Sequence, residues 1–274
     1  MYSCYCFNIT PPDPGSEILL AVLSELPFDT FEFTPEGLNA YCKEAAVSEI
    51  GLPDFSKYDF KLSYSITSIP FQNWNETWEA AYEPIQVGQV YIHAAFQKPN
   101  VNCKYNVCIT PKMSFGTGHH FTTRLMCTML QHLDVNTRHI WDIGTGTGIL
   151  AILSKLMGAQ HVDATDTELW ALDNARENAI NNFTNDIQVH AASEFIPQNH
   201  MYDVILANIN KNVLKYYAPI CAKSIKHQGQ LLISGFFETD TDELIRYFKT
   251  YGFDLAQVQT ESEWAAIQFI KSFS

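Results

Sequence analysis

The chain has 274 residues, enough for one large domain or two moderate ones, and 46% of them are hydrophobic, which supports a substantial core. Its 30 acidic residues outnumber the 17 lysines and arginines, so the formal net charge is −13. This charge disfavours direct binding to nucleic-acid phosphates and favours a basic partner or a cationic cofactor. The seven cysteines contain no CxxC pair, which indicates reduced thiols and argues against a zinc site or a disulfide framework.

The N-terminus lacks the basic and apolar regions of a signal peptide, and no apolar run reaches the length of a membrane span. We therefore expect a cytoplasmic protein that does not contact membranes.

Residues 1–68 are predicted to form a small α+β domain. Tyr5, Phe7 and Ile9 alternate with polar or small residues, as in a half-buried strand. After a proline-rich break, a helix is expected to begin at the cap residue Ser16. A second helix is expected before the last strand, which gives the βαββαβ order of a ferredoxin-like domain. The expected strands after the first helix are 28–33, 38–42 and 60–68.

Residues 69–85 are predicted to be a linker helix that leads into a second domain at 86–274. Large apolar residues in this segment recur at helical spacing and form one face. Packing between two domains explains such a face better than direct contact with a ligand. The residues on it are Trp74, Trp78, Tyr82 and Ile85.

Two further strands, over 89–96 and 105–110, precede a loop that contains two glycines. Glycines let the backbone approach a ligand closely. A helix is expected from Thr122 to His132, with Thr122 or Thr123 as its cap.

Two adjacent histidines, His119 and His120, lie in this loop. Neighbouring side chains point apart, and no acid is spaced to join them as a metal ligand. We therefore expect no metal site.

A glycine-rich turn follows the next predicted strand. A short apolar run ends at Asp142, and Gly144, Gly146 and Gly148 come directly before a segment with helical periodicity. About twenty residues later, Asp166 ends a strand at the position where a βαβ unit places its ribose-binding carboxylate. A nicotinamide fingerprint requires a glycine at the sixth position, and this turn has isoleucine there. The spacing looks like the first motif of the seven-strand S-adenosylmethionine (SAM) methyltransferases.

From residue 138 onward, strands and helices alternate, which predicts a parallel sheet with helices on both faces. Ligands of such sheets bind at the carboxyl ends of the strands, where Gly144, Asp166, Ser193 and Asn208 follow successive strands. The final two strands form a hairpin, which is typical of the methyltransferase sheet. The predicted strands are 139–143, 161–166, 187–191, 202–208, 229–235, 253–260 and 265–270.

These motifs together resemble the bacterial ribosomal protein L11 methyltransferase family. The resemblance is strong over 111–210, reasonable from there to the C-terminus, and over 1–68 it depends on size and pattern only. The motifs that carry it are Phe115-Gly116-Thr117-Gly118-x-His120-x-Thr122-Thr123, Asp142-x-Gly144-x-Gly146-x-Gly148, Asp166 and Asn208-Ile209.

The resemblance implies an enzyme that transfers methyl groups from SAM to lysine side chains and the N-terminal amine of ribosomal protein L11. It implies a seven-strand Rossmann-like domain, preceded by an N-terminal domain that recognises the basic protein substrate. We expect a monomer that does not bind nucleic acid directly.

The resemblance also assigns roles to residues. Asn208 would lie beside the methyl group and the incoming amine as the catalytic residue, and Asp166 would accept hydrogen bonds from the ribose hydroxyls. The cofactor-binding residues that it implies are Phe115, Thr122, Thr123, Asp142, Gly144, Gly146, Asp166 and Asn208.

This chain departs from the family at several positions. His119 stands where a threonine is common, and Phe121 where proline is usual. Asn210-Lys211 replaces Leu-Ala, which puts two polar residues near the acceptor pocket and bears on the identity of the amine.

Two alternatives remain open. One is a methyltransferase of another protein or of a nucleic-acid base, although such enzymes commonly carry Asn-Pro-Pro-aromatic where this chain has Asn208-Ile209-Asn210-Lys211. The other is a catalytically weak SAM-binding factor in ribosome assembly. Turnover of labelled SAM on candidate proteins separates the second alternative from an enzyme.

Overall fold

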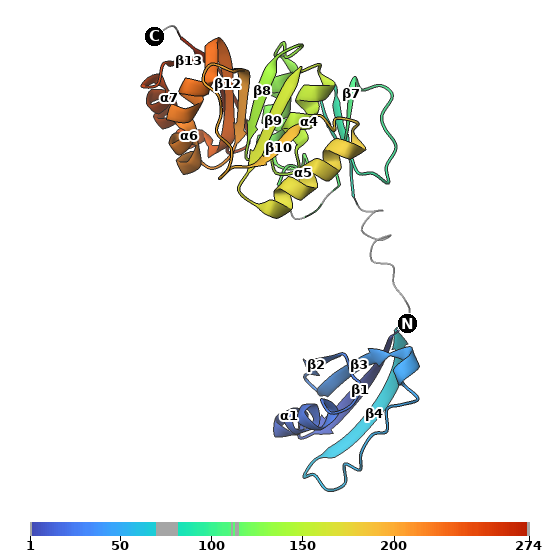
Figure 1. The fold of residues 1–274 in the computed structure, drawn as a ribbon. Helices are drawn as coiled ribbons and strands as arrows, with labels where there is room; N and C mark the ends of the chain where they lie inside the picture. Colours follow the sequence, from blue (N-terminus) through green and yellow to red (C-terminus); the bar gives the residue numbers. More distant parts are fainter. Residues whose placement is uncertain (1, 70–81, 111, 113–114, 273–274) are drawn as a thin grey trace. The chain divides into compact units, whose positions relative to one another are not determined.

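The computed structural model describes residues 2–69, 82–110, 112 and 115–272, and the chain divides into two compact units, 1–81 and 82–274. Figure 1 traces both units along the sequence. Most of the predicted linker helix at 69–85, including Trp74 and Trp78, lies outside the described residues. None of the helices in the described part of the chain is long and apolar enough to cross a membrane.

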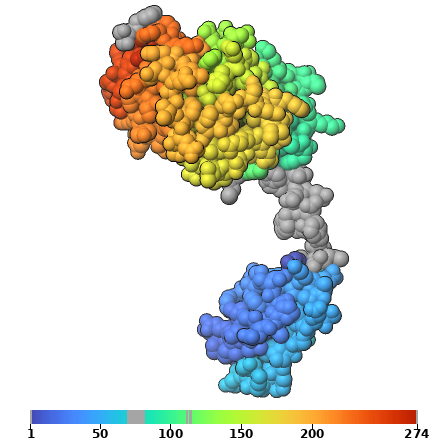
Figure 2. Space-filling view, viewed as in Figure 1, coloured from blue at the N-terminus to red at the C-terminus, as the bar shows by residue number. Residues whose placement is uncertain are grey.

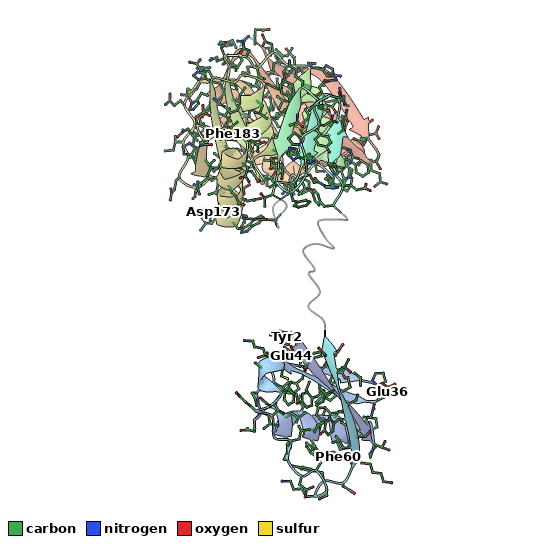
Figure 3. All side chains as sticks on the ribbon, turned by 90° about the vertical axis from the view of Figure 1, so that its right-hand side faces the viewer. Tyr2, Glu36, Glu44, Phe60, Asp173 and Phe183 are labelled. Carbon is green, nitrogen blue, oxygen red and sulfur yellow. The ribbon has the colours of Figure 1, made fainter. Side chains whose placement is uncertain are left out.

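The N-terminal unit is an antiparallel sheet with one helix. The strand order is β2-β3-β1-β4, and α1 packs its apolar residues Leu19 and Leu23 against Tyr5, Phe7 and Ile9 of β1. In Figure 3, Tyr2 and Glu44 lie at one end of this unit and Phe60 at the other. The elements are β1 (Tyr2–Thr10), α1 (Pro12–Leu23), β2 (Thr30–Thr34), β3 (Gly37–Lys43), the 3₁₀ helix η1 (Glu44–Ala46) and β4 (Lys61–Ile69).

Two predictions for this unit are wrong. The helix α1 spans Pro12–Leu23, but Asp13 has non-helical backbone angles, so its regular part begins at Pro14, two residues before the predicted cap Ser16. Proline is favoured at this position because it needs no N–H partner in the first turn. The second helix is reduced to the short η1 within the described part of this unit. Gly51 and Pro53 interrupt the segment that follows, which is unfavourable for a longer helix.

The larger unit begins with a small sheet of three strands, β5 (Ile85–Val87), β6 (Val90–His93) and β7 (Tyr105–Cys108). β5 and β6 pair antiparallel, whereas β6 and β7 pair parallel. The helix α3 (Phe121–Gln131) follows and buries Leu125, Met126 and Leu130.

The main sheet has seven strands in the order β10-β9-β8-β11-β12-β14-β13. Five neighbouring strands are parallel, and β14 is antiparallel to both of its neighbours, which confirms the predicted closing hairpin. The elements are β8 (His139–Ile143), α4 (Ile149–Leu156), β9 (His161–Asp166), α5 (Leu169–Asn181), β10 (Gln188–Ala191), β11 (Tyr202–Asn208), α6 (Lys211–Ser224), β12 (Ile225–Phe237), η2 (Glu238–Asp240), α7 (Thr241–Lys249), β13 (Phe253–Glu261) and β14 (Trp264–Lys271).

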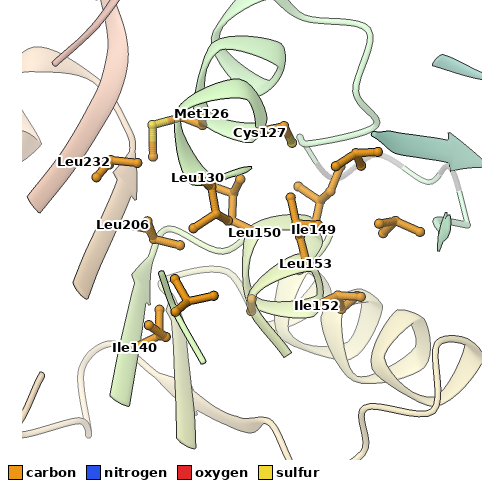
Figure 4. Close-up of a cluster of buried hydrophobic side chains, with 14 of the residues drawn as sticks. Met126, Cys127, Leu130, Ile140, Ile149, Leu150, Ile152, Leu153, Leu206 and Leu232 are labelled. Atoms are coloured by element: carbon orange, nitrogen blue, oxygen red, sulfur yellow. The ribbon is translucent and has the colours of Figure 1, made fainter. Parts of the chain in front are cut away.

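Helices cover both faces of this sheet. Figure 4 shows residues of α3 and α4, among them Leu130 and Leu153, packed with Leu206 of β11 and Leu232 of β12. On the other face, a second cluster contains residues of α6 and α7, including Leu214 and Phe248. In the space-filling view, side chains of the flanking segments cover the central strands (Figure 2).

The strand order determines where along the sheet a ligand-binding crevice forms. The chain runs outward from β8 to β10 and then returns to β11 on the other side of β8. A crevice forms at the carboxyl ends of β8 and β11 because their connections leave in opposite directions. The predicted alternation fails once, because residues 192–201 connect β10 to β11 without a helix.

Candidate functional site

The glycine-rich turn between β8 and α4 requires glycine for steric reasons. Gly144 and Gly146 have φ values of 69° and 55°, in the region that side chains disfavour. A Cβ at Gly146 would lie 2.4 Å from the carbonyl oxygen of Phe115, and one at Gly144 would lie 2.2 Å from Cγ2 of Ile209. The turn therefore fits tightly between two other segments of the site.

The second glycine-containing loop packs directly against this turn. The backbone N–H of Thr147 donates a hydrogen bond to the carbonyl oxygen of Phe115 at 3.0 Å. The Thr147 hydroxyl donates to the carbonyl oxygen of Gly116 at 2.7 Å. Two motifs that the sequence presents separately thus form one wall of the site.

A pocket of about 370 Å³ opens at the carboxyl ends of β8, β9 and β11. It brings together five of the predicted site residues, and its wall is mainly apolar. The residues that line it are Phe115, Ile143, Gly144, Gly146, Thr165, Asp166, Thr167, Trp170, Ala171, Ala192, Asn208, Ile209, Asn210, Val213 and Tyr217. The other three predicted residues, Thr122, Thr123 and Asp142, are buried and do not line this pocket.

The carboxylate of Asp166 is fixed at the pocket wall. Its Oδ2 accepts a hydrogen bond from the backbone N–H of Gly146 at 2.9 Å, and its Oδ1 accepts one from the backbone N–H of Glu168 at 3.1 Å. Each oxygen retains a lone pair for a further donor. Asp166 therefore both holds the glycine turn and presents an acceptor to the pocket.

Three polar atoms around the pocket have no hydrogen-bond partner among the residues that the structure describes. They are Oδ1 of Asn208, Oγ1 of Thr123 and Oδ1 of Asp142, and all three are buried. A buried polar atom without a partner costs free energy, so its retention indicates a ligand or water that completes it. Of the three residues, only Asn208 lines the pocket itself.

Asp142 is a buried acid at the end of β8. Burial raises the pKa of its carboxyl group to about 7, although the Thr145 hydroxyl donates a hydrogen bond to Oδ2 at 2.6 Å and opposes this shift. The repulsion from Asp166 adds to the rise. The acid therefore titrates near neutral pH.

The structure corrects the prediction for the cap of α3. The cap is His120, whose Nδ1 accepts a hydrogen bond from the backbone N–H of Thr122 at 3.3 Å and lies 2.8 Å from the Thr122 hydroxyl. Thr122 and Thr123 lie inside the helix. His119 contacts Thr117, and no group of metal-ligating side chains occurs in the described part of the chain.

The departure at Asn210-Lys211 has structural roles. The Asn210 side chain caps α6 by accepting a hydrogen bond from the Val213 N–H at 3.1 Å. Lys211 points to the acids of η2 and α7, with Nζ 2.6 Å from Asp240 and 3.1 Å from Glu243. Lys211 is thus held away from the pocket, whereas Asn210 caps α6 and also lines the pocket.

Sequence reasoning missed several residues of the pocket wall, among them Trp170, Ala192 and Tyr217. Trp170 lies in the first turn of α5, four residues after Asp166, and this proximity to a motif acid could have indicated it. Ala192 lines the pocket in place of its predicted neighbour Ser193. Tyr217 comes from the second turn of α6, and no local motif marks it.

Comparisons with known proteins agree with this geometry. The family model described as ribosomal protein L11 methyltransferase (PrmA) matches residues 34–272. A ribosomal protein L11 methyltransferase of Porphyromonas gingivalis is 33% identical over 98% of this chain and 97% of its own length. One of Chlorobaculum parvum is 35% identical over 90% of both chains.

A solved structure has a similar fold. The ribosomal protein L11 methylase of Lactobacillus delbrueckii subsp. bulgaricus matches with a TM-score of 0.64 and 23% identity, over 70% of this chain and 100% of that one. The match of the family model over most of the chain, together with relatives above 30% identity, shows the family. The chain belongs to the ribosomal protein L11 methyltransferase family.

Proposed function

We propose that this protein transfers methyl groups from SAM to lysine side chains and the N-terminal amine of ribosomal protein L11. The observation that carries the proposal is the buried amide oxygen of Asn208, which has no partner in the described part of the chain and lies in the pocket wall. The names of its relatives support L11 as the substrate.

The residues present fit SAM. Bound SAM supplies a methyl group that is already activated by its positively charged sulfur. The glycine turn allows close approach, and Asp166 has free lone pairs for the ribose hydroxyls. The partnerless oxygens of Thr123 and Asp142 are suited to the polar methionine end. Phe115, Thr122, Gly144 and Gly146 complete the proposed cofactor site as wall or support.

The amine must be neutral to react. A free lysine has a pKa of about 10.4, so its deprotonation near pH 7.4 costs about 4 kcal/mol. The apolar side chains of Phe115, Ile209 and Val213 would desolvate an ammonium group and lower its pKa. Asn208 Oδ1 would accept a hydrogen bond from the amine and orient it. These groups account for catalysis without a dedicated base.

We assign substrate recognition to the N-terminal domain, residues 1–68, and catalysis to residues 86–274, with 69–85 as the linker. The strand order β2-β3-β1-β4 supports a ferredoxin-like domain whose second helix is reduced to η1. We further propose that the enzyme acts as a cytoplasmic monomer and that its acidic charge attracts basic L11 and disfavours nucleic acid.

The proposal is tested by incubating the purified protein with L11 and labelled SAM. We expect incorporation of methyl groups at lysines and the N-terminus, located by mass spectrometry of L11 peptides. L11 from host cells that carry the gene should be methylated at the same sites, and L11 from cells that lack the gene should not. Absence of label on L11, with label on another protein or on ribosomal RNA, would reject this substrate.

A further inference from the structure

A row of aromatic side chains leads away from the pocket across the N-terminus of α3. The ring of Phe115 lies 5.0 Å from that of His120, which lies 4.7 Å from Trp264. Trp264 in turn lies 4.5 Å from Phe237. We call these four residues the aromatic row. Only its first member, Phe115, lines the cofactor pocket.

The aromatic row continues along the sheet from the end of the pocket that Asn208 lines, where we expect the acceptor amine. Asn208 of β11 pairs with Ser234 of β12, and β12 continues three residues further to Phe237. Phe237 pairs with Trp264 across the β12–β14 ladder. A substrate polypeptide whose amine lies at Asn208 would therefore lie beside this edge of the sheet.

The two ends of the row are exposed to an unusual degree for aromatic side chains. Phe115 is 51% exposed and Phe237 is 46% exposed. Burying such surface against a partner is favourable, at roughly 25 cal/mol per Å². His120 and Trp264 between them are half-buried. Exposed aromatic side chains at both ends of such a row, next to a reaction pocket, indicate a surface for a macromolecular substrate.

Charge identifies the substrate class. Glu238 follows Phe237, Glu263 precedes Trp264, and the backbone N–H of Glu238 donates to the carbonyl oxygen of Glu263 at 2.8 Å. Within the described residues, neither carboxylate forms an ion pair. Nearby charges are already paired, since Arg124 contacts Glu261 at 2.6 Å. The row is thus bordered by two available negative charges.

We propose that the aromatic row and the carboxylates of Glu238 and Glu263 bind the basic segment of L11 that flanks the acceptor amine. This inference rests on the proposed function and adds a docking surface on the catalytic unit. The rings take the aliphatic parts and cationic heads of lysine and arginine side chains. The carboxylates attract the flanking positive charges and help to select a basic protein.

The test uses two variants of the full chain, Phe237→Ser and the double charge reversal Glu238→Lys with Glu263→Lys. Each is expected to raise KM for L11 at least about fivefold, while kcat and the Kd for SAM stay near the wild-type values. The increase in KM caused by the charge reversal should become smaller as salt concentration rises, because salt screens exposed charges. Steady-state methylation of L11 gives the first readout and titration calorimetry the second.

Matched controls change the same chemistry elsewhere on the catalytic unit. Phe183, which is 94% exposed at the end of α5 (Figure 3), is changed to serine. Asp173 and Asp254, both exposed, are changed together to lysine. These controls should leave KM for L11 near the wild-type value.

Equal KM values for the row variants and the controls would overturn the docking surface. A loss of SAM affinity in the row variants that is as large as their rise in KM would also overturn it. If the wild-type enzyme leaves L11 unmethylated, the proposed function fails instead, so the two failures are distinguishable. Methylation of RNA that depends on Phe237 would also overturn the inference and point to a nucleic-acid substrate.

Discussion

Asp166 has two roles at once, and a substitution can separate them. Asp166→Ala removes the acceptor proposed for the ribose hydroxyls and also the bond to the Gly146 N–H. Loss of charged hydrogen bonds worth about 1.5–3 kcal/mol should weaken SAM binding roughly ten- to a hundredfold in titration calorimetry. Asp166→Asn keeps one oxygen for the Gly146 N–H and should lose less affinity for SAM. Unchanged affinity of the alanine variant would remove Asp166 from the site, and Asp173→Ala serves as the control.

Asn208 should matter more for turnover than for cofactor binding. Its amide oxygen has no partner in the described part of the chain, so we expect it to bond the amine as that group reacts. Asn208→Ala is expected to lower kcat for L11 by at least about tenfold while the Kd for SAM changes little. Steady-state kinetics and calorimetry on one preparation measure both. A parallel loss of the two would make Asn208 a cofactor residue only.

Asp142 should make stability depend on pH between the acidic and the neutral range. The pKa of its carboxyl group is about 7 in the folded protein, above the ordinary 3.8, because burial disfavours the charge. Between these two values the folded state holds a proton that the unfolded state has lost. This contribution to stability is therefore fully present below 3.8 and is lost as pH rises through about 7.

Wild-type protein should therefore lose stability between about pH 5 and about pH 8 relative to Asp142→Asn, which cannot ionise. Urea unfolding of both proteins at the two pH values measures the difference. A constant difference would show that Asp142 keeps the same protonation state in the folded and unfolded chains.

At the scale of elements, helix α5 and the residue that ends it hold β7 and the glycine turn together. The side chain of Asn178 accepts a hydrogen bond from the backbone N–H of Thr110 at 2.8 Å and donates one to the carbonyl oxygen of Thr147 at 2.9 Å. Asn182 bonds both the N–H and the carbonyl oxygen of Cys108 in the same way. Buried amides thus fix β7 and the glycine turn to one helix.

The His120 cap should be measurable through stability. His120→Ala removes the acceptor for the Thr122 N–H and is expected to lower the free energy of unfolding by about 0.5–2 kcal/mol. His120→Asn supplies another capping acceptor and should restore most of the loss. Urea denaturation at pH 7.5 or above keeps the histidine neutral, because burial lowers its pKa. His119→Ala is the control, and equal stability of all variants would show that the cap is unimportant.

At the scale of the whole molecule, the division of labour between the two units can be tested by truncation. A chain shortened to begin near Phe71 retains the complete second unit, 82–274. We expect it to fold and bind SAM with near-native affinity but to lose methylation of L11, because the aromatic row alone does not supply the recognition assigned to residues 1–68. Methyl transfer by the two proteins is compared side by side. An equal rate would show that the N-terminal unit is dispensable for recognition.

The sequence by itself determined the features that depend on a few neighbouring residues. Short apolar runs, in alternation with segments of helical periodicity, specified the strands of the large sheet, and glycine spacing specified the turn after β8. Because parallel strands end at one edge, those elements also predicted that Gly144, Asp166 and Asn208 lie together, as they do in the pocket.

Only the tertiary structure decided which distant segments meet. The contact of Phe115 with the glycine turn and the pairing of Phe237 with Trp264 leave no local pattern in the chain. The Arg124–Glu261 pair joins residues separated by 137 positions. Such contacts depend on strand order, register and packing, which are properties of the assembled sheet and its helices, whereas local propensity acts over only a few residues.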